Sequence, residues 1–307
     1  MSLLVYVIAY LAVIVFISAI VYRLVGYVRN PMHVRWELYP VAHEGKRASY
    51  GGSYMEEVDW WKKPRKKSLI AELKAMIEEI VLLKTVWENN RPLWYLTYSF
   101  HLGLYLTAAF IALVVIGAIA GLAGVAIGPI TALTKLIGLA GFLLALIGAV
   151  SLFCKRLADP GMRNYSSFGH FFNLALFIIT ICVGILTWLF VDPTFNMARG
   201  FVASLISLNL APIKSPLFLV QMLLASLLIA YIPLTHMAHF FMKYFLYHDI
   251  RWGDEPTVDN PATQAKIGVV LNYPVTWAAP HIAGHGKNTW AEVATFNPAA
   301  EPETEKE

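Results

Sequence analysis

The segment Leu93–Gly117, LWYLTYSFHLGLYLTAAFIALVVIG, decides the fold of this chain. It contains no Asp, Glu, Lys or Arg, and it is longer than the roughly 20 residues that an α-helix needs to cross the apolar core of a bilayer. Inside lipid, only a helix or a closed barrel satisfies every backbone polar group. The segment therefore predicts a transmembrane helix, and His101 is the most polar side chain within it.

Four other stretches are similarly apolar and long enough to cross the membrane: Leu3–Tyr22, Leu136–Phe153, Phe171–Val191 and Leu217–Tyr244. Of the 307 residues, 58% are hydrophobic and only 14% are charged, whereas about a quarter of a soluble domain is charged. The sequence therefore predicts an all-α membrane protein. We expect a five-transmembrane-helix bundle at 1–250, followed by a tail at 251–307.

The basic residues predict how the five spans are oriented. Five spans place the two termini on opposite sides, and all but three of the 24 Lys and Arg residues (Lys135, Arg199 and Lys214) fall on one side. By the positive-inside rule, that side is cytoplasmic. We therefore expect the N-terminus outside and the C-terminus inside, with a cytoplasmic loop at 23–92 and a cytoplasmic tail.

The predicted loop contains a segment at 68–86 with helical periodicity. Its apolar positions are Leu69, Leu73, Met76, Ile77, Ile80 and Val81. This spacing predicts an amphipathic helix with Ser68 as N-cap, which lies at the membrane surface, docks a partner or packs against the protein's own cytoplasmic face. The preceding run Trp60–Lys67 is rich in Trp and basic residues. That composition is typical of an anchor for anionic lipid headgroups, and it does not indicate nucleic acid.

Four of the nine histidines lie within or at the edges of the predicted spans: His101, His170, His236 and His239. Polar side chains in lipid cost free energy and tend to be functional. Imidazoles that face the interior of a helical bundle hold haem iron in many proteins. For any one histidine, the alternative is a hydrogen bond between helices without a cofactor.

Depth brings these histidines to one level of the membrane. At 1.5 Å per residue, His101 lies about 12 Å from the cytoplasmic end of its span, and His239 and His236 lie about 9 and 13 Å from that side. The sequence thus predicts a bis-histidine haem b in the cytoplasmic half. His236 and His239 share one face of a regular helix, and His170 is level with them, so we expect one haem rather than two.

Two short motifs resemble a known family. Phe100-His101-Leu102-Gly103 in the second span, and Pro233-Leu234-Thr235-His236-Met237-Ala238-His239 in the fifth, resemble the haem-binding segments of the gamma subunit of respiratory nitrate reductase. The same superfamily includes the cytochrome b subunits of membrane-bound heterodisulfide reductase and of the membrane complex associated with dissimilatory sulfite reduction. The resemblance covers roughly Leu93–Phe245.

The resemblance implies a ligand set for the haem iron. In that family, the cytoplasmic-side haem is held by the histidine of the Phe-His-x-Gly segment and by the histidine six residues after the fifth-span proline, which here are His101 and His239. The outer-side haem uses two further histidines, and this chain has Ile111 and Gln221 at those positions. This departure argues against an outer haem and against the outer quinol site beside it.

Four further residues are candidates to contact a haem propionate or a quinone. His236 stands where the nitrate-reductase-type subunit has a basic residue. Arg156 and Arg163 belong to the short link after the third span, and their alternative role is that of positive-inside anchors. His170 is the leading quinone-site candidate, because an imidazole suits proton exchange beside a menaquinone or similar quinone.

The chain has no flavin or nucleotide fingerprint and no CxxC pair for a cluster. The resemblance therefore implies a cytoplasmic iron–sulfur partner, of the heterodisulfide-reductase catalytic type or the ferredoxin-like type, docked over the first loop, the amphipathic helix and the tail. We expect a subunit of a quinone-linked respiratory complex in the cytoplasmic membrane of a prokaryote. The alternative is a haem-free membrane anchor for a soluble enzyme. A transporter would show broken helices or internal repeats; the sequence has no repeat, and only Pro129 and Pro233 lie near span ends or interiors.

Overall fold

A computed structural model describes residues 1–29, 56–63, 69–242, 261–279, 282–283 and 286–296 of the chain. The chain forms two compact units, a first of Met1–Tyr22 with Lys74–His239 and a second of Arg23–Leu73 with Phe240–Glu307. Parts of the predicted loop 23–92 and tail 251–307 lie outside the described residues, as do Ser68 and positions 64–67 of the basic run.

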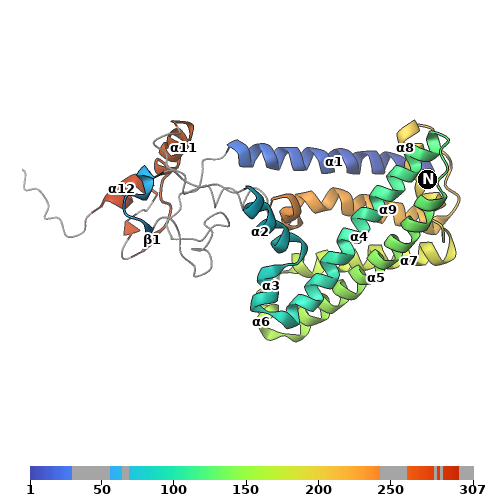
Figure 1. The fold of residues 1–307 in the computed structure, drawn as a ribbon, viewed down its shortest axis with the longest axis horizontal. Helices are drawn as coiled ribbons and strands as arrows, with labels where there is room; N and C mark the ends of the chain where they lie inside the picture. The colour runs from blue at the N-terminus through green and yellow to red at the C-terminus, as the bar shows by residue number, and fades with distance from the viewer. Residues whose placement is uncertain (30–55, 64–68, 243–260, 280–281, 284–285, 297–307) are drawn as a thin grey trace, which may run out of the picture. The chain divides into compact units, whose positions relative to one another are not determined.

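The chain is a multi-pass membrane protein with five helices long and apolar enough to cross a bilayer. These helices are α1 (Ser2–Arg29), α4 (Arg91–Leu122), α5 (Gly128–Ala158), α7 (Phe168–Phe190) and α9 (Pro216–Tyr231), the last extended by a 3₁₀ turn, η4 (Ile232–Leu234). Figure 1 shows α4 and α5 side by side, with α7 and α9 completing the bundle. Each predicted span coincides with one of these helices, except at the end of the fifth.

The fifth span does not continue as a regular helix to Tyr244, which itself lies outside the described residues. After α9, the chain forms η4 and a second 3₁₀ turn, η5 (His236–Ala238). Pro233 lacks the N–H that a helix interior requires, and Thr235 has extended backbone angles, φ −113° and ψ −175°. The prediction of a regular helix through the fifth-span histidines was therefore wrong, and His236 begins a 3₁₀ turn instead.

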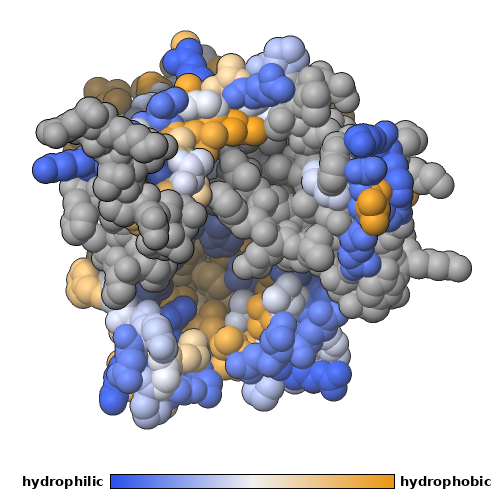
Figure 2. All heavy atoms as spheres, turned by 90° about the vertical axis from the view of Figure 1, so that its left-hand side faces the viewer, coloured by the Kyte–Doolittle hydropathy of each residue, from blue (hydrophilic) through white to orange (hydrophobic). Residues whose placement is uncertain are grey.

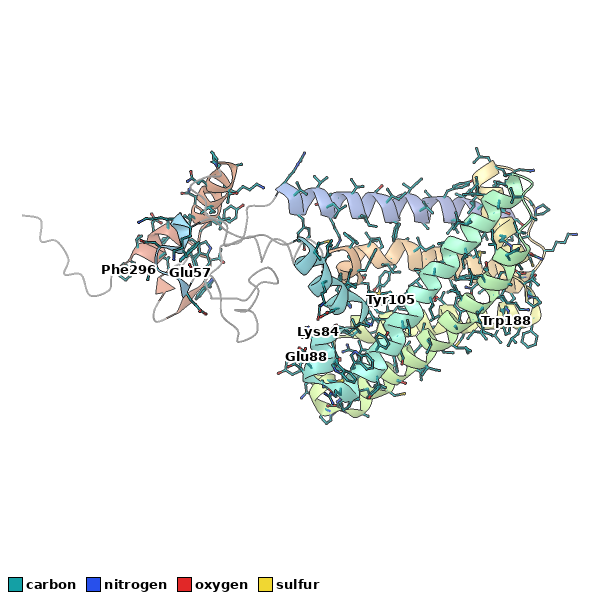
Figure 3. The ribbon with its side chains drawn as sticks, in the orientation of Figure 1. Glu57, Lys84, Glu88, Tyr105, Trp188 and Phe296 are labelled. Atoms are coloured by element: carbon teal, nitrogen blue, oxygen red, sulfur yellow. The ribbon has the colours of Figure 1, made fainter. Side chains whose placement is uncertain are left out.

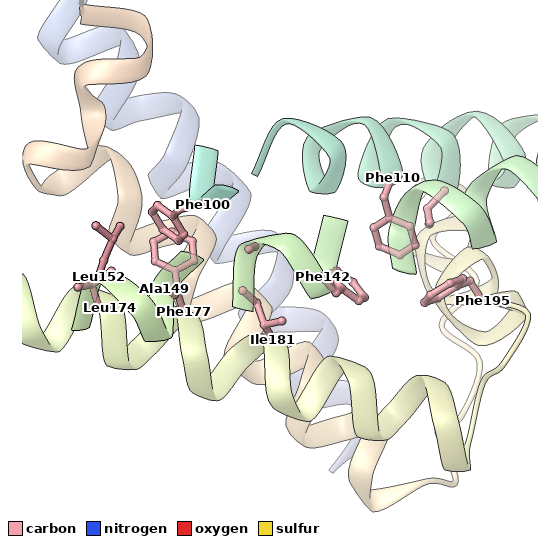
Figure 4. Close-up of a cluster of buried hydrophobic side chains, with 11 residues drawn as sticks. Phe100, Phe110, Phe142, Ala149, Leu152, Leu174, Phe177, Ile181 and Phe195 are labelled. Atoms are coloured by element: carbon pink, nitrogen blue, oxygen red, sulfur yellow. The ribbon is translucent and has the colours of Figure 1, made fainter. Parts of the chain in front are cut away.

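Small residues bring α4 and α5 into close contact. A Cβ on Gly103 would lie 2.2 Å from the backbone nitrogen of Ala145, and a Cβ on Gly148 would lie 2.3 Å from that of Phe100. Only glycine permits backbones to approach so closely. Figure 4 shows the buried cluster around this contact, in which Phe100 packs against Phe177 of α7 at 5.3 Å between ring centres.

Side chains fill the opposite end of the first unit. Phe195 lies between Phe110 and Phe142, with ring centres 4.7 and 6.3 Å away. Tyr6 of α1 stacks on Phe201 of α8 (Asn196–Ser207) at 4.7 Å. The N-terminal part of α1 is thereby held against the bundle.

Two short helices precede α4. Side chains of α4 donate hydrogen bonds to backbone carbonyls at and just beyond the end of the first of them. The predicted helix at 68–86 is divided into α2 (Leu69–Val81) and α3 (Lys84–Asn89), because Leu83 adopts a left-handed conformation with φ 52°. The Tyr105 hydroxyl donates to the Ile80 carbonyl at 2.6 Å, and the Trp94 indole donates to the Leu82 carbonyl at 2.7 Å (Figure 3). Carbonyls at a helix C-terminus lack partners within the helix, so these bonds tie the end of α2 to α4.

The second unit contains short elements. The described part of its C-terminal portion has α11 (Pro261–Leu271), an antiparallel pair of two-residue strands, β1 (Ala278–Ala279) and β2 (Ile282–Ala283), and α12 (Trp290–Thr295). Val275, with 1% of its surface exposed, is buried in this portion. A 3₁₀ turn, η3 (Trp60–Lys62), lies in the part that precedes α2.

Candidate functional site

The predicted site residues gather at one end of the bundle. His101 lies near the start of α4, Arg156 near the end of α5, His170 at the start of α7, and His236 and His239 beyond the end of the fifth span. Antiparallel connections bring these helix ends together. In the lower part of Figure 2, where α3 and α6 (Pro160–Asn164) lie, hydrophilic residues surround more deeply placed apolar ones.

His101 is oriented by the backbone of its own helix. Its Nδ1 lies 2.8 Å from the carbonyl oxygen of Thr97, one turn earlier. A carbonyl oxygen only accepts hydrogen bonds, so Nδ1 carries the proton and the lone pair of the neutral ring is on Nε2. Metal-binding histidines are commonly oriented in this way by a backbone carbonyl.

His239 is oriented by the same kind of contact. Its Nδ1 lies 3.0 Å from the carbonyl oxygen of His236, at the start of η5. The lone pair of neutral His239 is therefore also on Nε2. The 3₁₀ turn after Pro233 provides this i to i−3 contact, so the break in the fifth span positions the histidine.

The separation of the two rings fits one metal ion between them. The ring centres of His101 and His239 are 6.2 Å apart, and the ring planes are inclined by 57°. A metal–imidazole bond of about 2.0 Å, with the nitrogen about 1 Å from its ring centre, places two imidazoles on opposite sides of one metal with centres about 6 Å apart. Among the described residues, no group of three or more His, Cys, Asp or Glu side chains could hold a metal ion.

The second pair of histidines is arranged differently. The ring centres of His170 and His236 are 5.3 Å apart. The backbone N–H of Ser167 donates to Nδ1 of His170 at 2.9 Å, within the N-terminal capping box of α7. Because Nδ1 accepts, a neutral His170 carries its proton on Nε2 and has no lone pair there for iron. His170 thus differs from His101 and His239, whose neutral rings have the lone pair on Nε2.

A chain of polar side chains links His236 to α7 and α9. The Tyr231 hydroxyl donates to Oδ1 of Asn173 at 2.9 Å, and Nδ2 of Asn173 lies 3.5 Å from Nε2 of His236. Asn173 is buried, with 6% of its surface exposed. Since its amide nitrogen donates, Nε2 of His236 accepts and the proton of this ring is on Nδ1.

Arg156 faces this cluster, and Arg163 does not contact it. The Arg156 guanidinium donates to the Ser166 hydroxyl through Nη1 at 2.8 Å, and its positive charge is close enough to act on His236. Its Nε is buried and makes no hydrogen bond with the described residues. Arg163 is exposed on α6, and among the described residues its side chain makes no hydrogen bond or ion pair.

Asp159 fixes the corner between α5 and α6, three residues after Arg156. Asp159 accepts hydrogen bonds from the backbone N–H groups of Gly161 and Met162, as the N-cap of α6. Its carboxylate also pairs with Lys155 at 2.8 Å. The hydrogen bond from Lys155 lowers the pKa of the Asp159 carboxyl. The Asp159 carboxylate therefore stays ionised at neutral pH.

The two positions that would carry an outer haem in the resembling family face different surroundings. Ile111 is 48% exposed on the surface of the bundle. The amide of Gln221 lies against α7, with Nε2 only 3.3 Å from where a Cβ on Gly184 would be. No pair of facing side chains comparable to His101 and His239 is formed by these two residues.

Sequence reasoning missed three members of the site: Ser167, Asn173 and Tyr231. Asn173 was detectable, because an amide inside an apolar span is costly unless it is hydrogen-bonded. The roles of Ser167 and Tyr231 depend on which atoms face the histidines, and the sequence pattern does not fix that.

Comparison with known proteins does not assign this site. No family model matches the chain, and no curated protein is significantly similar to it. Packing explains part of the motif in the second span, since Phe100 and Gly103 contact α5 at Gly148 and Ala145. The functional argument therefore depends on the geometry of His101 and its neighbours.

Proposed function

We propose that this chain is a haem b-containing membrane subunit of a respiratory electron-transfer complex. It exchanges electrons between menaquinone or another quinone and a cytoplasmic iron–sulfur oxidoreductase partner. The haem, when bound, supplies an iron that gains or loses one electron at a time. The chain's own residues bind and orient this group.

The observation that carries the proposal is the His101–His239 pair. Both rings have Nδ1 against a backbone carbonyl oxygen, and their centres are 6.2 Å apart. Three features thus agree with axial ligation of one iron: the tautomer of each ring, the ring separation and the origin of the ligands on different helices.

The orientation in the membrane follows from the distribution of basic residues. We place the N-terminus outside and the histidine end on the cytoplasmic side of a prokaryotic inner membrane. Arg156 and Lys155, at the end of α5, then lie at the cytoplasmic surface, and Arg163 acts as a positive-inside anchor there.

The amphipathic α2 provides part of a surface for the iron–sulfur partner. Its apolar residues Ile77 and Val81 are 56% and 44% exposed, while Tyr105 and Trp94 tie the carbonyls of its end to α4. Tyr105 also lies 6.4 Å from His101 between ring centres. A partner docked on α2 would therefore be close to the haem.

The test is a reduced-minus-oxidised spectrum with haem quantitation on the purified chain. We expect one b-type haem per chain in the wild type. A value of two would mean that a second site exists, contrary to the proton positions on His170 and His236. Absence of haem after expression with sufficient haem supply would contradict the proposal and favour a haem-free membrane anchor.

A further inference from the structure

We propose that a donor cluster beside the haem, made of Arg156, His170, Asn173, Tyr231 and His236, binds the head group of a quinone through a carbonyl oxygen. The inference rests on the proposed function, in which a quinone is the electron partner of the haem. It adds the location of the quinone and the atoms that recognise it.

His170 presents a hydrogen-bond donor to this site. Its Nδ1 accepts from the backbone N–H of Ser167 at 2.9 Å, and the Ser167 hydroxyl lies 3.0 Å from the same nitrogen. The proton of the neutral ring is therefore on Nε2. The capping box fixes the ring direction, so the donor does not depend on a flexible side chain.

His236 presents a second donor. Tyr231 donates to Oδ1 of Asn173, which leaves the Asn173 amide nitrogen to donate toward Nε2 of His236. The remaining proton of His236 is then on Nδ1. Its ring centre is 5.3 Å from that of His170, so the two rings are neighbours and their donors lie in one part of the bundle.

Arg156 adds a donor whose acceptor is missing from the protein. Its Nε is buried and has no hydrogen-bond partner among the described residues, although Nη1 bonds to Ser166. A buried donor without an acceptor costs free energy. With donors from His170, His236 and Arg156, the ligand that completes this cluster must supply acceptor oxygens.

The surroundings favour a flat, lipid-soluble acceptor over a free anion. Phe172 is 41% exposed, and its ring packs edge-on against Tyr231 with centres 5.6 Å apart. Phe168, which is 81% exposed, stacks on Phe172 at 6.0 Å. Aromatic rings beside the donors suit the ring of a quinone, and their exposure on a membrane helix allows entry from the lipid.

The cluster also adjoins the proposed haem ligands. The carbonyl oxygen of His236 accepts the hydrogen bond that orients His239. A quinone that contacts the side chain of His236 would thus bind a residue whose own backbone contacts the proposed iron ligand His239. This position suits electron exchange between the two groups.

The experiment measures menadione binding to the full-length chain, purified in detergent with its haem, by titration calorimetry. Replacing His170 by Phe (His170→Phe) removes the Nε2–H donor, and we expect the Kd to rise about tenfold, as for loss of one hydrogen bond to a ligand. His170→Gln keeps an N–H donor near the Nε2 position and should stay within about threefold of the wild type. Asn173→Leu removes the amide that donates to Nε2 of His236. This variant should weaken menadione binding while the His170 donor stays in place.

Thr187→Val is the matched control. Thr187 is also buried on α7 but lies at the far end, where its hydroxyl bonds to the Val183 carbonyl of its own helix. We expect an unchanged Kd in this variant. Thermal melting of each variant shows whether a loss of binding reflects unfolding.

Two outcomes would overturn the inference. An unchanged Kd in both His170→Phe and Asn173→Leu would exclude the cluster as the quinone site. Reduced haem content with an unchanged Kd would show that the donors bind the haem propionates instead. If the chain carried no haem but menadione binding fell as expected, the inference would stand and the proposed cytochrome function would fail.

Discussion

The two ends of the first unit differ in how their polar side chains are oriented and packed. At the histidine end, His101 and His239 are each oriented by a backbone carbonyl, and their ring centres are 6.2 Å apart. At the opposite end, the corresponding family positions, Ile111 and Gln221, face the surface of the bundle and the backbone of α7. Aromatic packing around Phe195 fills that end.

The two ends therefore differ in which side chains meet and in how the backbone orients them. The histidine end is distinguished by the break in the fifth span, because the 3₁₀ turn there supplies the His236 carbonyl that orients His239. At the opposite end, the polar side chain Arg199 is buried with 4% exposure, and its Nη2 bonds to the Thr194 carbonyl at 2.9 Å. That end offers no imidazole.

The strongest test of this contrast is removal of the proposed iron ligands. His101→Ala and His239→Ala should each abolish the b-type spectrum, because one imidazole holds haem far less tightly than two. His170→Ala is the matched control and should retain the full haem content. His236→Ala should also retain it, since the carbonyl that orients His239 belongs to the backbone. Haem loss in all four variants would indicate general unfolding and would contradict the assignment of distinct roles.

The second prediction concerns the glycine of the motif in the second span. Gly103→Ala should destabilise the chain by about 1–3 kcal/mol, as overpacking does, because the new Cβ would meet Ala145. Gly121→Ala on the same helix is the control, since no atom lies within 4 Å of its Cβ position. Thermal unfolding in detergent measures both. Equal melting temperatures would show that α4 and α5 do not approach as closely as described.

The third prediction concerns the charged contact between α2 and α3. The hydrogen bond from Lys84 to Glu78, at 2.9 Å, lowers the pKa of the Glu78 carboxyl. Because the pKa is lowered in the folded state, the contact stabilises the fold at pH values above the ordinary pKa of Glu. This stabilisation is lost as the pH falls through the lowered pKa. Lys84→Met should therefore raise the pKa of Glu78 toward its ordinary 4.5, as followed by carboxyl NMR. No change would show that the pair is absent in solution.

The smallest expected effect comes from restoring histidines at the opposite end. The double variant Ile111→His with Gln221→His should still bind one haem per chain. Ile111 is 48% exposed, whereas Gln221 lies against Gly184, so the new imidazoles would not face each other. Haem quantitation gives the result directly, and a second b-type haem would show that the two ends are more alike than their packing indicates.

The sequence predicts the bundle better than the site. Apolar length alone is sufficient for the five helices, because lipid demands internally bonded backbones. The depth argument also places His101 and His239 at one level, and the structure brings their rings together. The prediction of a regular helix was wrong beyond Pro233, where a 3₁₀ turn spans His236–Ala238.

The finer parts of the site depend on atoms that no pattern reveals. The proton positions on His170 and His236 are set by Ser167 and Asn173, which contact them across a helix cap and between two helices. Arg163 had the same basic character as Arg156 in the sequence, yet only Arg156 faces the cluster. The proton positions and the different contacts of the two arginines thus depend on where side chains point, which residue composition does not specify.

The central claim is that one iron is held between His101 and His239, and electron paramagnetic resonance of the oxidised, purified chain tests it most directly. We predict a single low-spin ferric signal with the anisotropy of two imidazole ligands, lost in His101→Ala and in His239→Ala and kept in His170→Ala. A signal that persisted in either ligand variant, or a high-spin signal in the wild type, would contradict the account.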